Sequence, residues 1–162
     1  MFLAEVQQIY QDYMDDLVVL QASLKPTDGL MGFGKRADSD PCHARFSDRL
    51  ELKLREIAEQ APSSQETAEL MRFVYEAAKK SKEDVSAYWM LVAVHGHTAV
   101  LIPLLSSADA TELSRLYLDR YPKYSLLPMQ KRLVGQLQEQ SGKAPRQKKG
   151  LASLFKKSEW DT

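Results

Sequence analysis

The chain has 162 residues, of which 44% are hydrophobic and 27% charged, the size and composition of one globular domain. Its single cysteine excludes an internal disulfide, so a reducing compartment and a cytoplasmic protein are expected. The formal net charge is zero but uneven, because segment 141–162 holds six basic and two acidic residues. The remainder, 1–140, is therefore mildly acidic, which argues against a broad nucleic-acid-binding surface.

The spacing of apolar residues predicts a first helix over 2–24. Its apolar residues recur at alternating intervals of three and four: Leu3, Val6, Tyr10, Tyr13, Leu17, Leu20 and Leu24. This spacing lines one face of a helix. Pro26 ends the helix, because the residue before a proline disfavours helical geometry. Such a seam serves either a bundle core or a homodimer, and both interpretations stay open.

Helix-start signals divide the middle of the chain. Asp40-Pro41 is typical of an N-cap followed by proline at the first helical position, and it predicts a helix over 41–60. Ser63 and Glu66 have the spacing of a capping box and predict the next helix, up to about residue 80. Segment 25–40, rich in glycine and charge, is predicted to be a loop.

The most apolar stretch, 87–105, is about as long as a membrane span. Its centre holds His95, Gly96 and His97, whose polar groups are costly in lipid. We therefore expect a helix that is apolar all round and deeply buried, broken near Gly96, with a further helical segment after the break.

Prolines and a glycine mark the last helices. One is predicted from Ser107 or Asp109 to Pro122, and another from Pro128 to Gly142. Six or seven helices in total indicate an all-α fold, a single irregular multi-helix bundle over 1–140. An armadillo- or HEAT-like helical array is the alternative, although no repeat of 30–45 residues is evident.

All three histidines and the cysteine fall in two clusters, Cys42-His43 and His95-Gly96-His97. Thiolate and imidazole are ligands of zinc and components of Cys–His nucleophiles. In a helix, adjacent residues diverge by about 100° and residues two apart by about 200°. A shared site therefore requires the chain to leave helical geometry at Gly96. Cys42, His43, His95 and His97 are the candidate metal ligands, with zinc as the implied ion, while the main expectation is that no cofactor is bound.

The sequence favours a non-catalytic protein–protein interaction module that binds a partner or itself. Loop 29–40 and tail 141–162 are the expected binding surfaces, because loops carry recognition on a rigid scaffold. The tail is expected to be flexible, with a short amphipathic helix at 150–160 as the alternative. Two other functions stay open. One is a metal- or thiol-dependent enzyme built on the two Cys/His clusters, and the other is a membrane-peripheral protein bound through its basic tail.

Overall fold

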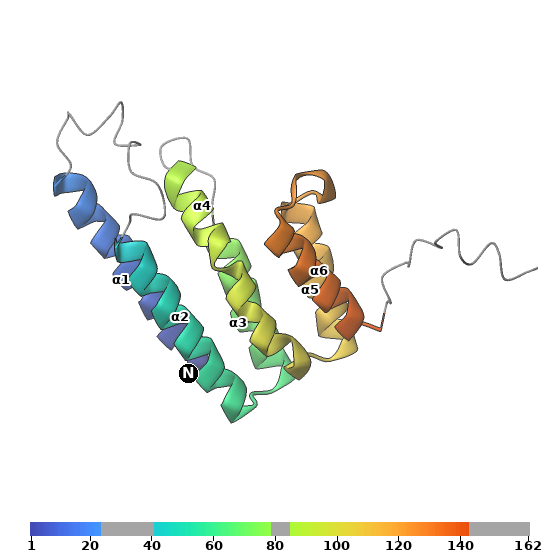
Figure 1. Ribbon diagram of the computed structural model, residues 1–162. Helices are drawn as coiled ribbons and strands as arrows, with labels where there is room; N and C mark the ends of the chain where they lie inside the picture. Colours follow the sequence, from blue (N-terminus) through green and yellow to red (C-terminus); the bar gives the residue numbers. More distant parts are fainter. Residues whose placement is uncertain (24–40, 79–84, 143–162) are drawn as a thin grey trace, which may run out of the picture.

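The computed structural model describes residues 1–23, 41–78 and 85–142, and all regular structure within these ranges is helical (Figure 1). The elements are α1 (Phe2–Ser23), α2 (Pro41–Gln60), α3 (Ser64–Ala77), α4 (Val85–Ala93), the 3₁₀-helix η3 (His95–Leu104), α5 (Ser107–Arg120), the short 3₁₀-helix η4 (Lys123–Ser125) and α6 (Pro128–Gln140). The predicted all-α multi-helix bundle is confirmed for the described part of the chain.

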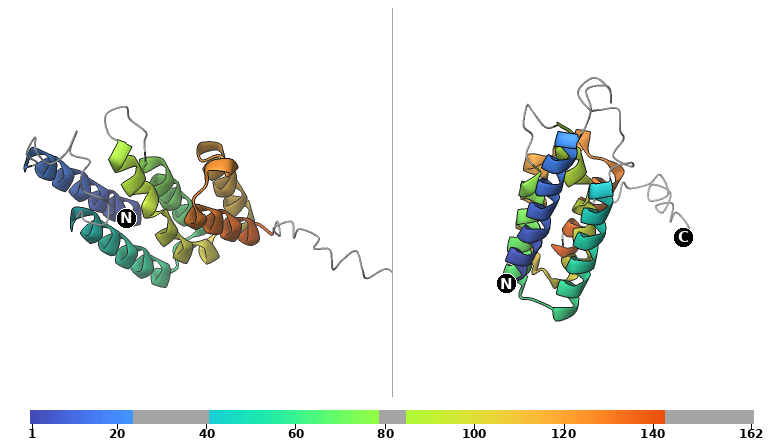
Figure 2. Two further views of the ribbon diagram at one scale, coloured as in Figure 1. Left: turned by 45° about the horizontal axis from the view of Figure 1, so that its top comes forward. Right: turned by 90° about the vertical axis from the view of Figure 1, so that its left-hand side faces the viewer.

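The helices form three antiparallel hairpins that lie side by side in chain order (Figures 1 and 2). They are α1 with α2, α3 with α4 and η3, and α5 with α6. Helices α1, α3 and α5 make one layer, and α2, η3 and α6 make the other. The bundle thus has the consecutive stacking of helical hairpins that characterises helical arrays.

The capping signals in the sequence start the helices where they were expected. The Ser63 hydroxyl accepts the Glu66 backbone N–H at 3.2 Å, and the Glu66 carboxylate accepts the Ser63 backbone N–H at 3.1 Å. Helix α5 begins after Ser106, whose hydroxyl accepts the Asp109 backbone N–H at 3.1 Å. Gly142 follows α6 with a φ of +73°, a conformation that glycine adopts without strain. Local hydrogen bonding therefore accounts for these helix ends.

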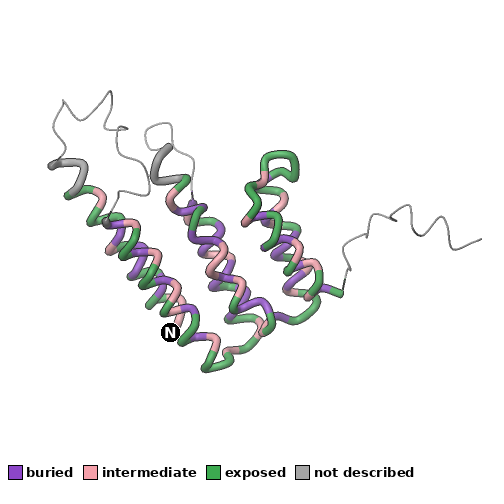
Figure 3. The backbone as a smooth tube through the Cα atoms, viewed as in Figure 1, coloured by how far each residue is buried: buried purple, intermediate pink, exposed green. Residues whose placement is uncertain are grey.

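The apolar seam of α1 packs into the core rather than facing outward over its described length. Val6, Tyr10 and Tyr13 are buried. The Tyr13 ring stacks on Phe46 of α2 with centroids 4.4 Å apart, and Tyr10 meets the edges of Phe46 and Phe73 at 4.9 and 5.1 Å. Buried residues alternate with exposed ones along α1, α2, α3, α5 and α6 (Figure 3). Aromatic contacts thus join α1, α2 and α3 into one core.

The apolar stretch bends away from α-helical geometry near the expected glycine. Helix α4 ends at Ala93 and η3 starts at His95. A Cβ at Gly96 would lie 3.0 Å from Cγ of Met129, so the missing side chain lets η3 approach α6. The expectation that this helix is buried all round is wrong at Trp89, which is 48% exposed. Within the described residues, no helix combines the length and the apolar character needed to cross a membrane.

The buried Tyr10 hydroxyl has no hydrogen-bond partner among the described residues, and burial raises its pKa above the usual value. We predict that Tyr10→Phe raises the free energy of unfolding by about 1 kcal/mol, because it removes an unsatisfied polar group while keeping the ring. Urea denaturation measures this change. Tyr124→Phe, at a side chain that is 92% exposed, is the control and should change stability little. A loss of stability in Tyr10→Phe would contradict the assignment.

Candidate functional site

The Cys42 thiol lies in the first turn of α2 and faces α1. It is buried, and Nη2 of Arg45 lies 3.7 Å from its sulfur. Tyr13 and Asp16 of α1 line the same small hollow of about 190 Å³. The thiol is therefore directed away from the histidines of the second cluster.

His43 and His97 lie at the interface of α2 with the α4–η3 segment. Nε2 of His43 is 3.0 Å from the Met90 carbonyl oxygen, and Nε2 of His97 is 2.8 Å from the Ser47 hydroxyl. Burial lowers the pKa of His97, and the nearby Glu51 carboxylate partly opposes this shift. Each of the two imidazoles thus has a hydrogen-bond partner on the facing helical segment.

His95 points the other way, into the core between η3, α3 and α5. Its side chain is fully buried, and Nδ1 lies 2.9 Å from the Tyr117 hydroxyl. His95 and His97 diverge across Gly96, as the helical spacing predicts. Within residues 1–23, 41–78 and 85–142, no group of three or more His, Cys, Asp or Glu side chains could hold a metal. The four candidate ligands are therefore divided among three places, with only His43 and His97 on the same interface.

A chain of hydrogen bonds connects His95 to α5 and α6. The Gln130 carbonyl accepts the Leu127 backbone N–H at 2.9 Å, so its amide nitrogen is the group that donates to the Tyr117 hydroxyl, at 3.1 Å. The Tyr117 hydroxyl lies 2.9 Å from Nδ1 of His95 and completes the chain from Gln130 to the imidazole. Nε2 of His95 is buried and makes no hydrogen bond to a described residue.

A second arm of hydrogen bonds joins the backbone carbonyl of His95 to α3. Thr98 donates to the His95 carbonyl at 2.8 Å, and the Tyr75 hydroxyl lies 2.8 Å from the Thr98 hydroxyl. The Tyr121 hydroxyl donates to the Tyr75 carbonyl at 3.2 Å. We call these six side chains the His95 network: Tyr75, His95, Thr98, Tyr117, Tyr121 and Gln130. The network ties together α3, η3, α5 and α6.

The surroundings of His95 keep its imidazole uncharged. Burial lowers its pKa to about 3; the Val74 carbonyl opposes this shift, and the positive charge of Arg120 adds to it. A buried imidazole with such a pKa does not exchange protons with a substrate near neutral pH. The geometry and electrostatics of His95 therefore indicate a structural role.

A surface hollow of about 450 Å³ lies directly beside the His95 network, at the end of α3 and the turn between α5 and α6. Its lining residues are Ala78, Trp89, Arg120, Tyr121, Pro122, Ser125 and Gln130. We call it the Arg120 hollow. Tyr121 and Gln130 belong to both the hollow and the network, so the wall of the hollow is anchored in the core.

Backbone carbonyls at the end of α3 hold the Arg120 guanidinium in place. Its Nη2 donates to the carbonyls of Glu76 and Ala78 at 3.2 and 2.9 Å. These contacts place a cation at a helix C-terminus, where the helix dipole favours positive charge. Nη1 and Nε donate to no described residue. Arg120 is thus an oriented cation with unused donors.

Exposed aromatic and apolar side chains lie in or next to the chain segments that line the Arg120 hollow. Trp89 is 48% exposed on α4, Tyr124 of η4 is 92% exposed, and Leu127 just before α6 is 42% exposed. Pro122 and Ser125, which line the hollow, lie on either side of Tyr124 in the sequence. We call Trp89, Tyr124 and Leu127 the apolar rim.

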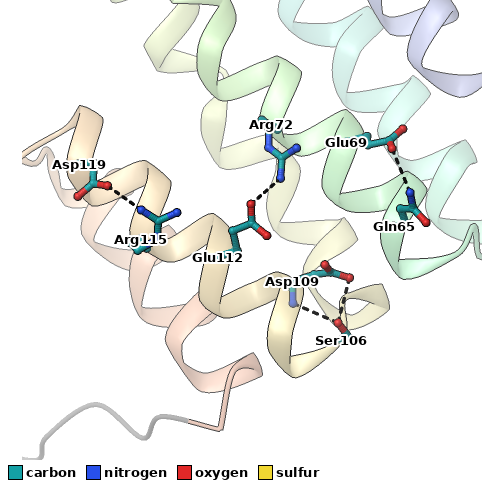
Figure 4. Close-up of polar contacts among 8 residues, drawn as sticks. All are labelled: Gln65, Glu69, Arg72, Ser106, Asp109, Glu112, Arg115 and Asp119. Carbon is teal, nitrogen blue, oxygen red and sulfur yellow. Dashed lines mark hydrogen bonds and ion pairs between the residues drawn. The ribbon is translucent and has the colours of Figure 1, made fainter.

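The outer face of α3 and α5 has a different character, because both arginines drawn there are paired with carboxylates (Figure 4). Arg72 pairs with Glu112 at 3.0 Å across the two helices, and Arg115 pairs with Asp119 at 3.3 Å within α5. Exposed pairs of this kind contribute little to stability. They leave this face less suited to attract a charged partner than the Arg120 hollow.

The expected binding surfaces, loop 29–40 and the tail from residue 143, lie outside the described residues. The Arg120 hollow was not predicted from the sequence. Its one local signal is the connection Tyr121–Pro128, in which two prolines enclose an aromatic residue that fits no helical face. No family model, curated protein or solved structure matches this chain. The evidence for function is therefore the geometry itself.

We predict that acid destabilises the protein through His95. The unfolded chain protonates this imidazole near its ordinary pKa of 6.5, whereas the folded chain resists protonation down to about pH 3. The unfolded state therefore binds more protons between these values, and stability falls as pH falls. One such group contributes about 1.4 kcal/mol per pH unit well below 6.5.

Urea denaturation at pH 7.5, 6.0, 5.0 and 4.5 tests this linkage. His95→Gln should lose stability at pH 7.5 but show a shallower decline toward pH 4.5 than the wild type. NMR of the wild-type imidazole gives a second measure that does not depend on the variant's folding. A His95 ring that titrates between pH 5 and 7 would contradict the assignment.

Proposed function

We propose that this protein is a non-catalytic interaction module that binds a partner protein at the Arg120 hollow and its apolar rim. The observation that carries the proposal is the exposure of Trp89 and Tyr124 beside an oriented arginine. Trp, Tyr and Arg are the residue types that dominate the energetics of protein interfaces. Their proximity at one end of the bundle favours recognition there.

The core beneath this surface supports the proposal. Tyr121 and Gln130 are buried and hydrogen-bonded within the His95 network, while both line the Arg120 hollow. A surface anchored in this way loses little conformational freedom when a partner binds. More of the contact energy then appears as affinity.

The placement of the Cys/His candidates also favours a binding role. A catalytic centre shared by both clusters would need these side chains to converge. Cys42 faces α1, His95 faces α3 and α5, and His43 and His97 lie between α2 and the α4–η3 segment. The four side chains thus contribute to packing or hydrogen bonding in three parts of the fold, with only His43 and His97 sharing one.

Site-specific crosslinking tests the proposal. A photoreactive residue at position 124 should capture a discrete partner from a native extract, and the same residue at position 52 should not. Leu52 is the matched control because it is 63% exposed on α2, in the first hairpin. The captured protein is then purified and its affinity measured directly; sedimentation velocity tests a second copy of the chain as the partner.

The double variant Tyr124→Ser, Leu127→Ser should bind the purified partner at least about tenfold more weakly, because hot-spot side chains contribute about 2 kcal/mol or more. Leu52→Ser should bind as the wild type does. Thermal denaturation should show little change in either variant, since these side chains are exposed. Unaltered affinity in the double variant would overturn the proposal.

A further inference from the structure

We infer that the Arg120 hollow recognises a carboxylate next to an apolar side chain, so that the partner segment is an acidic, apolar peptide. This inference rests on the proposed function and names the chemistry of the segment that binds. It starts from the unused hydrogen-bonding capacity of Arg120.

Arg120 differs from most of the described arginines. Of the other six, Arg132 is exposed on α6, and five lie within 3.9 Å of a carboxylate oxygen: Arg45, Arg49, Arg55, Arg72 and Arg115. The Arg120 guanidinium instead contacts two backbone carbonyls through Nη2 and forms no ion pair with a described residue. Its charge is held in place and is not neutralised by a carboxylate of the described fold.

The charged residues near Arg120 in the described part of the fold are of both signs. Lys123 adds a second cation in the turn after α5. Arg120 also borders a second hollow, between α3 and α5, which two acidic residues line. Asp119 is paired with Arg115, and Glu76 lies on α3. A carboxylate from a partner would accept hydrogen bonds from Nη1 or Nε, and charge-assisted bonds of this kind are the stronger class.

The walls of the hollow provide the apolar part of the site. Trp89, Tyr121 and Pro122 line it, and its volume of about 450 Å³ is within the range of small-ligand pockets. Such a space accommodates an aromatic or branched side chain beside the carboxylate. Charge complementarity to Arg120 thus selects an acidic peptide rather than a basic or neutral one.

Two short peptides of matched size test this chemistry on the full chain. Acetyl-Trp-Glu-amide and acetyl-Trp-Gln-amide are titrated into ¹⁵N-labelled protein, and the Trp89 indole resonance is followed by NMR. The glutamate peptide should bind about fivefold more tightly, a preference that should shrink at high salt. Equal affinities for the two peptides in the wild type would overturn the inference.

Variants then assign the preference to one side chain. Arg120→Gln should bind both peptides equally, whereas Arg132→Gln should keep the fivefold preference, because Arg132 is exposed on α6 and does not line the hollow. If Arg120→Gln does not fold, Arg120→Lys is the second variant. It keeps the positive charge and should retain part of the preference. A preference that survives in folded Arg120→Gln would also overturn the inference.

Segment 159–161 of the same chain, Glu-Trp-Asp, has similar chemistry and is the competing occupant. A triple variant of the full chain tests this occupant: Glu159→Gln, Trp160→Ala and Asp161→Asn. If the occupant is a partner, the variant should bind the glutamate peptide with unchanged affinity. A fivefold gain would assign the hollow to the chain's own segment and overturn the inference. If the wild type shows no peptide preference but still binds the partner through Tyr124, only this inference is refuted. If the peptide preference is present but partner binding does not depend on Tyr124, the proposed function is refuted.

Discussion

The structure depends on keeping one imidazole neutral inside the core. A charged His95 would lose its hydration without gaining a carboxylate partner, and burial of an unpaired ion is among the largest costs a fold can carry. The hydrogen bonds from Gln130 through Tyr117 give Nδ1 a partner, while Nε2 has none among the described residues. These bonds depend on how α3, η3, α5 and α6 are placed, so they favour a single packing where apolar contacts alone would tolerate several.

The same network explains why the end of the bundle suits recognition. Tyr121 and Gln130 reach from the buried imidazole to the Arg120 hollow, and Arg120 ties the end of α5 to the end of α3. Arg120 also helps to keep His95 uncharged. Core and surface are thus coupled electrostatically: the residue that we assign to ligand recognition also favours the protonation state on which the core relies.

Local chemistry in the sequence was enough to predict the helices, because caps such as Ser63 with Glu66 act within one turn. The divergence of His95 and His97 also followed from helical spacing. The partners of His95 could not be predicted, since Tyr75 and Tyr117 come from helices about twenty residues away on either side. The role of Arg120 was equally hidden, because its carbonyl partners precede it by more than forty residues. Side-chain type and spacing were therefore enough to predict the helices. The site could not be predicted, because it forms only when the helices pack together.

The arrangement of hairpins has a consequence for how the molecule opens. Buried hydrogen bonds of the His95 network join the second and third hairpins, whereas α1 and α2 meet the second hairpin through aromatic packing and the part-buried hydrogen bonds of His43 and His97. The first hairpin therefore has the features of a separate foldon, a unit able to detach while the others persist. Thermal fluctuation would then expose the amides of α1 to exchange with solvent before those around His95, and the binding end would be the last part to melt.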